Sequence, residues 1–144
     1  MRHVVVAAMM LATPALADVE RMEAQGSVDE AFARLQDAVE EAGATVFATV
    51  DHGAGASDAG MDLGASKLLI FGNSQLGMPV MQEDMTAGLV LPLKMLVYDD
   101  DGQTYVAYEE VEETFDDFDV DDDLEVFERM EDALENFATA AAGS

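Results

Sequence analysis

Apolar residues recur every three or four positions in two long segments of the chain, and this spacing predicts two amphipathic helices. The first covers about residues 28–42, where Ser27 and Glu30 form a capping-box pattern and Gly43 provides a left-handed stop. The second covers about residues 121–141, and its acidic first turn suits the positive end of the helix dipole. Each helix is therefore expected to bury one face.

Four shorter segments have the alternating or continuous hydrophobicity of β-strands, at residues 45–52, 68–71, 93–98 and 104–110. Asp101 and Gly102 favour a tight hairpin between the last two strands. Pro79 suits the first turn of a short helix that reaches about Ala87. Residues 18–26 show no clear period and are assigned no element. The order of elements predicts an α+β fold, a compact two-layer domain with a four-stranded mixed β-sheet packed against helices.

The start of the chain has the three-part layout of a secretory signal peptide. Arg2 supplies positive charge, residues 4–11 are apolar, and an Ala-Leu-Ala cleavage sequence precedes Asp18. The apolar run is shorter than the roughly 20 residues that span a bilayer. We therefore predict a signal peptide at 1–17 and a single domain at 18–144 that is exported, periplasmic or extracellular, and free of the membrane after cleavage. An uncleaved anchor and a buried N-terminal helix are the alternatives.

The chain is strongly acidic, with 31 Asp and Glu residues, 6 Lys and Arg residues and a formal net charge of −25. This charge repels nucleic acid and anionic lipid head groups, so neither is expected as a partner. Hydrophobic residues make up 50% of the chain, which allows a folded core. The composition indicates a halophilic-type surface whose self-repulsion is relieved by salt, or an ordinary acidic periplasmic protein.

The sequence contains no cysteine. The domain is therefore expected to fold without disulfides, and thiolate-bound zinc, iron–sulfur clusters and covalently attached haem are excluded. We expect no cofactor.

His52, Asn73 and Ser74 are the candidate ligand-binding residues. Each follows or ends an apolar strand, and parallel strands would bring the ends of both strands to one sheet edge, where they would form a crevice. His52 titrates near neutral pH and can act as a general base, but no motif places a serine or cysteine nucleophile beside it. A ring that hydrogen-bonds the loop 53–55 is the structural alternative. No catalytic residue is assigned.

Two weaker patterns concern metals. Three methionines at helical spacing would suit Cu(I): Met78, Met81 and Met85. Core packing is the preferred interpretation, with Met81 and Met85 on one face of a short helix that packs on the sheet. Four acids follow the cadence of an EF-hand loop: Asp117, Asp119, Asp121 and Glu128. Asp122 occupies the position where that loop needs glycine, so a solvated helix start is the preferred interpretation and no metal is assigned.

From residue 51 onward, the segments DHGAGASDAGMDL, LLIFGN, GMPVM and LPLKMLVY, with Tyr108 after the hairpin, resemble the domain of unknown function 302 family. The resemblance covers roughly residues 45–108 and extends to the first helix. It implies a compact α+β domain that is often a homodimer, and it implies no established activity. Ser74 departs from the usual proline of the family, and Val90 departs from the usual aspartate.

These features together favour an exported, non-catalytic domain that binds a small ligand or a protein partner and works as a homodimer. The alternatives are a periplasmic metal-handling protein, which would use the methionines for Cu(I) or the acidic loop for Ca²⁺, and an enzyme built around His52.

Cleavage between Ala17 and Asp18 is the first testable prediction, because the charged, apolar and small-residue segments occur in the order that signal peptidase requires. Intact-mass measurement of the protein recovered from outside the cytoplasm should give a chain that begins at Asp18. Recovery of a chain that still carries residues 1–17 would contradict the prediction.

Overall fold

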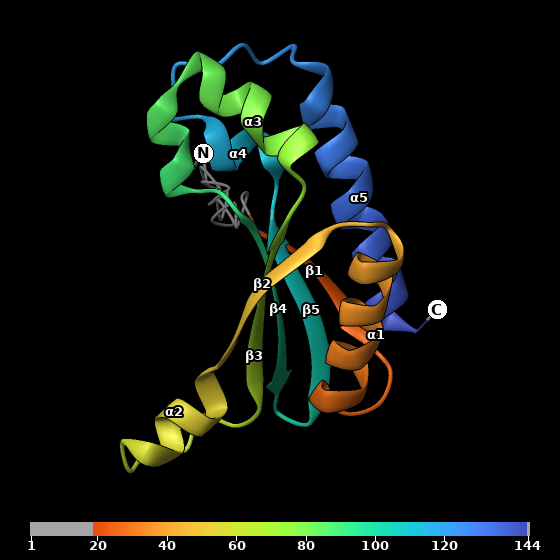
Figure 1. Ribbon diagram of the computed structural model, residues 1–144. Coiled ribbons are helices and arrows are strands. Elements are labelled where there is room, and N and C mark those ends of the chain that lie inside the picture. The colour runs from red at the N-terminus through yellow and green to blue at the C-terminus, as the bar shows by residue number, and fades with distance from the viewer. Residues whose placement is uncertain (1–18, 144) are drawn as a thin grey trace, which may run out of the picture.

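The structure is a computed structural model that describes residues 19–143, so the predicted signal peptide lies outside the described residues. The described part consists of two layers, an antiparallel sheet and the long helices α1 and α5, which pack against each other on one sheet face (Figure 1). Its five strands lie in the order β1-β5-β4-β3-β2: β1 (Val19–Ala24), β2 (Thr45–Asp51), β3 (Ser66–Gly72), β4 (Leu93–Asp100) and β5 (Gln103–Glu109). The predicted α+β class is confirmed.

The prediction of a four-stranded mixed sheet is wrong in two respects. The described residues include a further strand, β1, which has little apolar pattern because Glu20, Arg21 and Glu23 lie on an edge strand. Backbone pairing with β5, from Val19 opposite Glu109 onward, holds it in place. Every neighbouring pair of described strands is antiparallel. From β2 to β5, each connection leaves the sheet at one end and re-enters it at the same end, so the direction of the chain reverses each time.

Both long helices form, and the first begins as predicted. In α1 (Val28–Glu41), Ser27 Oγ accepts a hydrogen bond from the Glu30 amide at 3.2 Å, and the Ser27 amide donates to the Glu30 carboxylate at 2.8 Å. Gly43 follows it with a φ of 79°. The last helix, α5 (Glu125–Ala142), begins later than predicted, because an acidic loop follows the short helix α4 (Val111–Phe115).

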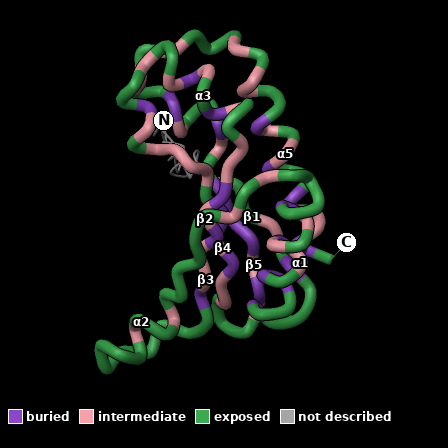
Figure 2. Tube along the Cα trace, viewed as in Figure 1, coloured by how far each residue is buried: buried purple, intermediate pink, exposed green. Residues whose placement is uncertain are grey.

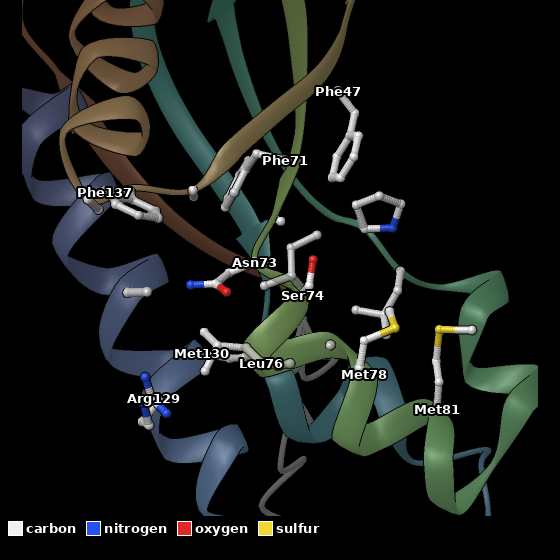
Figure 3. A pocket seen from close by; sticks show the side chains of 18 of the residues that line it. Phe47, Phe71, Asn73, Ser74, Leu76, Met78, Met81, Arg129, Met130 and Phe137 are labelled. Atoms are coloured by element: carbon white, nitrogen blue, oxygen red, sulfur yellow. The ribbon is translucent and has the colours of Figure 1, made fainter.

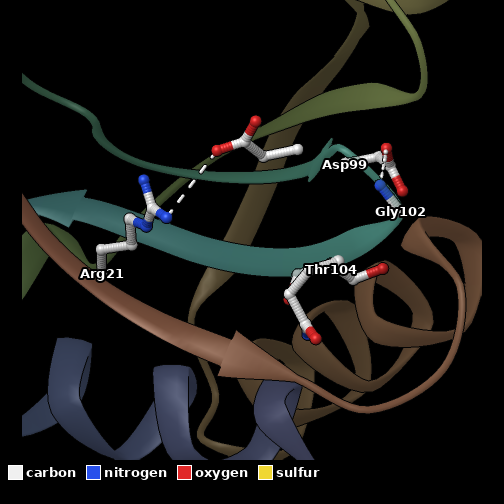
Figure 4. A network of polar contacts seen from close by, with 6 residues as sticks. Arg21, Asp99, Gly102 and Thr104 are labelled. Atoms are coloured by element: carbon white, nitrogen blue, oxygen red, sulfur yellow. Dashed lines mark hydrogen bonds and ion pairs between the residues drawn. The ribbon is translucent and has the colours of Figure 1, made fainter.

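The hairpin between β4 and β5 turns where predicted. Asp101 and Gly102 have φ values of 51° and 90°, and Asp99 Oδ1 accepts a hydrogen bond from the Gly102 amide at 3.1 Å (Figure 4). Two central residues with positive φ match the twist of the flanking strands. On the neighbouring strand β1, the Arg21 guanidinium lies 3.8 Å from the Asp100 carboxylate (Figure 4).

The connection from β3 to β4 contains the helix α3 (Ser74–Glu83) and a short 3₁₀ helix, η1 (Met85–Leu89). The prediction that Pro79 lies in the first turn of a helix is wrong. Asn73 caps α3, so Pro79 lies inside the helix and not at its start. Asn73 Oδ1 accepts a hydrogen bond from the Gln75 amide at 2.9 Å. α3 therefore begins directly at the end of β3.

The other connection, from β2 to β3, projects away from the body of the molecule (Figures 1 and 2). It carries the short helix α2 (His52–Asp58), in which no residue is buried. Every residue of β2 except Val46 is exposed as well, and Figure 2 shows the part of β2 that leads to α2 in green. The two connections thus lie at opposite ends of the sheet.

The core lies between the long helices and one face of the sheet. Alternate strand residues point into it, and Leu69, Met95 and Val97 are all fully buried there. Leu35 of α1 and Leu134 of α5 belong to the same cluster. The side chains between these strand positions lie on the other face and remain partly exposed.

Leu35→Ala should lower the free energy of unfolding by about 2–5 kcal/mol, because truncation of a buried leucine removes apolar contacts and leaves a cavity. Leu89→Ala is the matched control, since the Leu89 side chain is 83% exposed whereas that of Leu35 is 0% exposed. Urea denaturation measures both changes. Equal losses in the two variants would contradict the assignment of Leu35 to the core.

Candidate functional site

A cavity of about 490 Å³ opens where α3 and η1 meet the ends of β2, β3 and β4 (Figure 3). The strand ends supply Phe47, Phe71 and Leu93, while α3 supplies a wall that begins at Ser74. The N-terminal half of α5 closes the opposite side with residues from Arg129 to Phe137. We call this cavity the α3–α5 pocket.

Most of the pocket lining is apolar. Aromatic rings, methionines and leucines make up its bulk: Phe47, Phe71, Phe137, Met78, Met81, Met130, Leu76, Leu91 and Leu93. Phe71 and Phe137 are almost fully buried and meet edge to face, with ring centroids 5.5 Å apart. Pockets of this size with few polar groups are typical of sites for small organic ligands.

Gly72 allows the strand ends to come close together at the pocket. A Cβ atom on Gly72 would lie 3.3 Å from Cε2 of Phe47 and 3.4 Å from Cβ of Pro92, so a larger residue would press on both rings. The pairing of β2 with β3 shifts register between Val46 and Ala48, which leaves Phe47 out of the ladder. The Phe47 side chain is 59% exposed and stands at the edge of the pocket (Figure 3).

Three side chains give the pocket its polar chemistry. Asn73 uses Oδ1 to cap α3 and directs its amide nitrogen toward α5, and the Ser74 hydroxyl points into the cavity (Figure 3). Arg129 projects from α5 and is the charged residue of the lining. Within the described residues, the Asn73 amide nitrogen, the Ser74 hydroxyl and the Arg129 guanidinium have no hydrogen-bond or ion-pair partner. All three are free to donate hydrogen bonds to a ligand.

The predicted crevice between His52 and Asn73 is wrong. Because β2 and β3 are antiparallel, Asp51 pairs with Lys67 at one end and Thr45 pairs with Gly72 at the other. Six residues of strand separate the two ends, roughly 20 Å at 3.4 Å per residue. His52 begins α2 on the projecting connection, and its ring makes no hydrogen bond to other described residues, so the structural alternative for His52 also fails.

The other two candidate ligand-binding residues do come together. Asn73 and Ser74 both line the α3–α5 pocket, although the residues that face them differ from the predicted partner. The crevice hypothesis therefore placed Asn73 and Ser74 correctly in the wall of a cavity. It placed the opposite wall, at His52, at the wrong end of the sheet. Whether these residues bind a ligand stays a prediction.

The methionines divide between two environments. Met78 and Met81 line the pocket, and the Met81 thioether packs close to Gly88 of η1. Met85 belongs to η1 instead of α3, lies outside the lining and is 74% exposed. The expectation that Met81 and Met85 pack together on the sheet is therefore wrong for Met85.

The acidic loop before α5 uses its polar groups internally. The Asp119 amide donates to Asp84 Oδ2 at 3.0 Å, and the Asp121 amide donates to Glu83 Oε2 at 2.6 Å. Hydrogen bonds from the Thr86 hydroxyl and from the Asp119 and Thr86 amides lower the pKa of Asp84. Nowhere in residues 19–143 do three His, Cys, Asp or Glu side chains converge as a metal site would require. The carboxylates of Glu83 and Asp84 instead tie this loop to the end of α3.

Sequence reasoning missed the residues that α5 and β2 contribute to the pocket. Met130, Ala133 and Phe137 follow the ordinary helical period of a core helix, so their spacing carried no signal of a cavity. The sequence did contain a signal for Arg129, because it is the only basic residue after Lys94 in a strongly acidic sequence. Phe47 looked like one member of an alternating strand.

The fold and the site define a small α+β domain with an open, largely apolar pocket. The family described as "Domain of unknown function DUF302" matches residues 20–137, and the chain belongs to this family. The crystal structure of an uncharacterized conserved DUF302 protein from Bacillus stearothermophilus has the same fold, with a TM-score of 0.77 at 20% sequence identity. The match covers 85% of this chain and 97% of that one.

Two relatives are named as ion channels. The chain is 43% identical over 79 residues to the "Fluoride-specific ion channel FluC 1" of Brucella suis biovar 1 (strain 1330), and equally so to its counterpart in Brucella abortus biovar 1 (strain 9-941). The matched segment is 55% of this chain but only 31% and 29% of those proteins. Among residues 19–143, no helix has the length and apolar character needed to cross a membrane.

Proposed function

We propose that the protein binds a small, mainly apolar ligand in the α3–α5 pocket and performs no chemistry on it. The observation that carries the proposal is a cavity of about 490 Å³ with an apolar lining and three polar side chains that have no protein partner among the described residues. Such a combination binds an apolar body by burial and orients it with a few hydrogen bonds.

Binding explains the pocket better than catalysis does. General acids and bases are usually histidines or carboxylates, and the residues described as lining the pocket include neither. His52 is the residue around which an enzyme would be built, but it lies at the opposite end of the sheet from Asn73, the residue that the sequence suggested would face it. The Cu(I) alternative is weakened because Met85 stands apart from Met78 and Met81. The Ca²⁺ alternative is weakened because no three acidic or histidine side chains converge within residues 19–143.

We also propose that the protein is exported and forms a homodimer. Export is supported by the pattern of residues 1–17. The dimer is supported by the sheet face that the long helices leave open. Val50, Leu68 and Leu96 lie opposite one another across β2, β3 and β4 on that face, and Val50 is 39% exposed. A row of apolar side chains with partial exposure is suited to burial against a second copy.

Val50→Asp should convert the dimer to a monomer, because a two-fold interface would bring two added carboxylates together in a buried row. Leu89→Asp adds the same charge at an apolar residue that is 83% exposed on η1, and it should leave the dimer intact. Multi-angle light scattering measures the mass of each species. A wild-type protein that stays monomeric at every concentration would contradict the dimer.

Ser74→Phe should abolish ligand binding, because its ring would occupy the cavity into which the Ser74 hydroxyl points. Gln75→Phe is the matched control, since Gln75 is the next exposed residue of α3 and does not line the pocket. Both substitutions lie at exposed positions and should change stability by about 0.5 kcal/mol or less. Calorimetric titration with decanol, an apolar probe, tests the pair.

Unchanged decanol binding by Ser74→Phe, or an equal loss in both variants, would contradict the proposal that the α3–α5 pocket is the binding site. Retention of binding in Gln75→Phe together with its loss in Ser74→Phe would support it.

A further inference from the structure

We infer that the natural ligand of the α3–α5 pocket is an amphipathic monoanion, a molecule with an apolar body and one carboxylate that pairs with Arg129. This inference rests on the proposed binding function and specifies the chemical class of the ligand.

The first argument is the distribution of charge. Of the 144 residues, 31 are Asp or Glu, yet none of the residues described as lining the pocket is acidic. Arg129 is the charged group among them. An anion in the pocket is therefore not repelled by any carboxylate of the lining, although the whole chain has a net charge of −25.

The second argument is that Arg129 has no partner among the described residues, unlike Lys67 and Arg34. Lys67 pairs with Asp29 at 2.7 Å, and the Arg34 guanidinium donates to the Ala141 carbonyl at 2.8 Å. Within the described residues, Arg129 makes no hydrogen bond or ion pair, although acidic residues precede and follow it on α5. A guanidinium presents five donors that fit a carboxylate in bidentate geometry.

The third argument is that the remaining polar groups of the pocket also donate. Asn73 Oδ1 already accepts from the Gln75 amide, so its free group is the amide nitrogen, and the Ser74 hydroxyl has no partner among the described residues. Both lie at the N-terminus of α3, a ten-residue helix whose dipole favours negative charge there. Each of the three groups can donate to a ligand group that only accepts hydrogen bonds.

The apolar lining describes the rest of the ligand. The rings of Phe71 and Phe137 form a fixed surface, whereas the flexible thioethers of Met78 and Met81 adapt to different shapes. A single guanidinium matches a single negative charge, which favours a carboxylate on an apolar body over a polyphosphate. A medium-length alkanoate has this chemistry.

Decanoate and decanol test the inference, because they share an alkyl chain and differ in the charge of the head group. In calorimetric titrations of the purified protein at neutral pH and 0.15 M salt, decanoate should bind about fivefold more tightly than decanol, which is the upper range for an ion pair with an exposed residue such as Arg129. Arg129→Gln should remove this preference, because it should weaken the binding of decanoate more than the binding of decanol. Lys94→Gln, which removes one charge from an exposed residue outside the lining, should keep it.

The outcomes separate the inference from the function on which it rests. Equal affinity of the wild-type protein for both probes, or a preference that survives in Arg129→Gln, overturns the inference and leaves apolar binding standing. Loss of the preference in Lys94→Gln as well overturns it too, because net charge and not Arg129 would then set the selectivity. Failure of both probes to bind overturns the proposed function itself.

Discussion

The antiparallel pairing of β2 with β3 decides what stands at each end of this molecule. With Thr45 opposite Gly72 and Asp51 opposite Lys67, the end of β3 faces the start of β2. The short helix α2 is carried away from the core on the projecting connection, while α3 begins where β3 and β4 meet. Among the described residues, α3, η1 and α5 therefore converge at one end of the sheet, and the pocket lies at that end.

The position of α5 depends on a second set of contacts. Its C-terminal half is held in the core by Phe137 and Ala138 and by the Arg34 side chain, which donates two hydrogen bonds to the Ala141 carbonyl. Its N-terminal half then extends past the sheet and reaches α3, where Arg129 and Met130 become pocket residues. The same helix thus stabilises the fold at one end and forms the site at the other.

The acidic composition acts differently in different parts of the structure. Glu83 and Asp84 accept backbone hydrogen bonds from the acidic loop. Hydrogen bonds from the Thr86 hydroxyl and the Asp119 amide favour the charged form of Asp84 and lower its pKa. This contribution to stability is present at neutral pH and is lost as the pH falls through the lowered pKa of Asp84. Acids elsewhere cover exposed helix surfaces, and the described pocket lining lacks them.

Features that depend on neighbouring residues could be predicted from the amino-acid sequence alone. The capping box at Ser27, the helical period of α1 and the turn at Asp101-Gly102 all follow from contacts within a few positions of the chain, and the structure contains each of them. The family could also be identified from its segments, and it matches residues 20–137.

Strand direction, the edge strand β1 and the second wall of the pocket depend on contacts between distant segments of the chain. An alternating pattern has the same period in parallel and antiparallel strands, so it could not place His52 relative to Asn73. β1 is held by backbone pairing with β5, which leaves little trace in its side chains. Arg129 lines the same pocket as Ser74 only because α5 folds back across the sheet, and periodicity within one helix contains no information about the distant segment it will face.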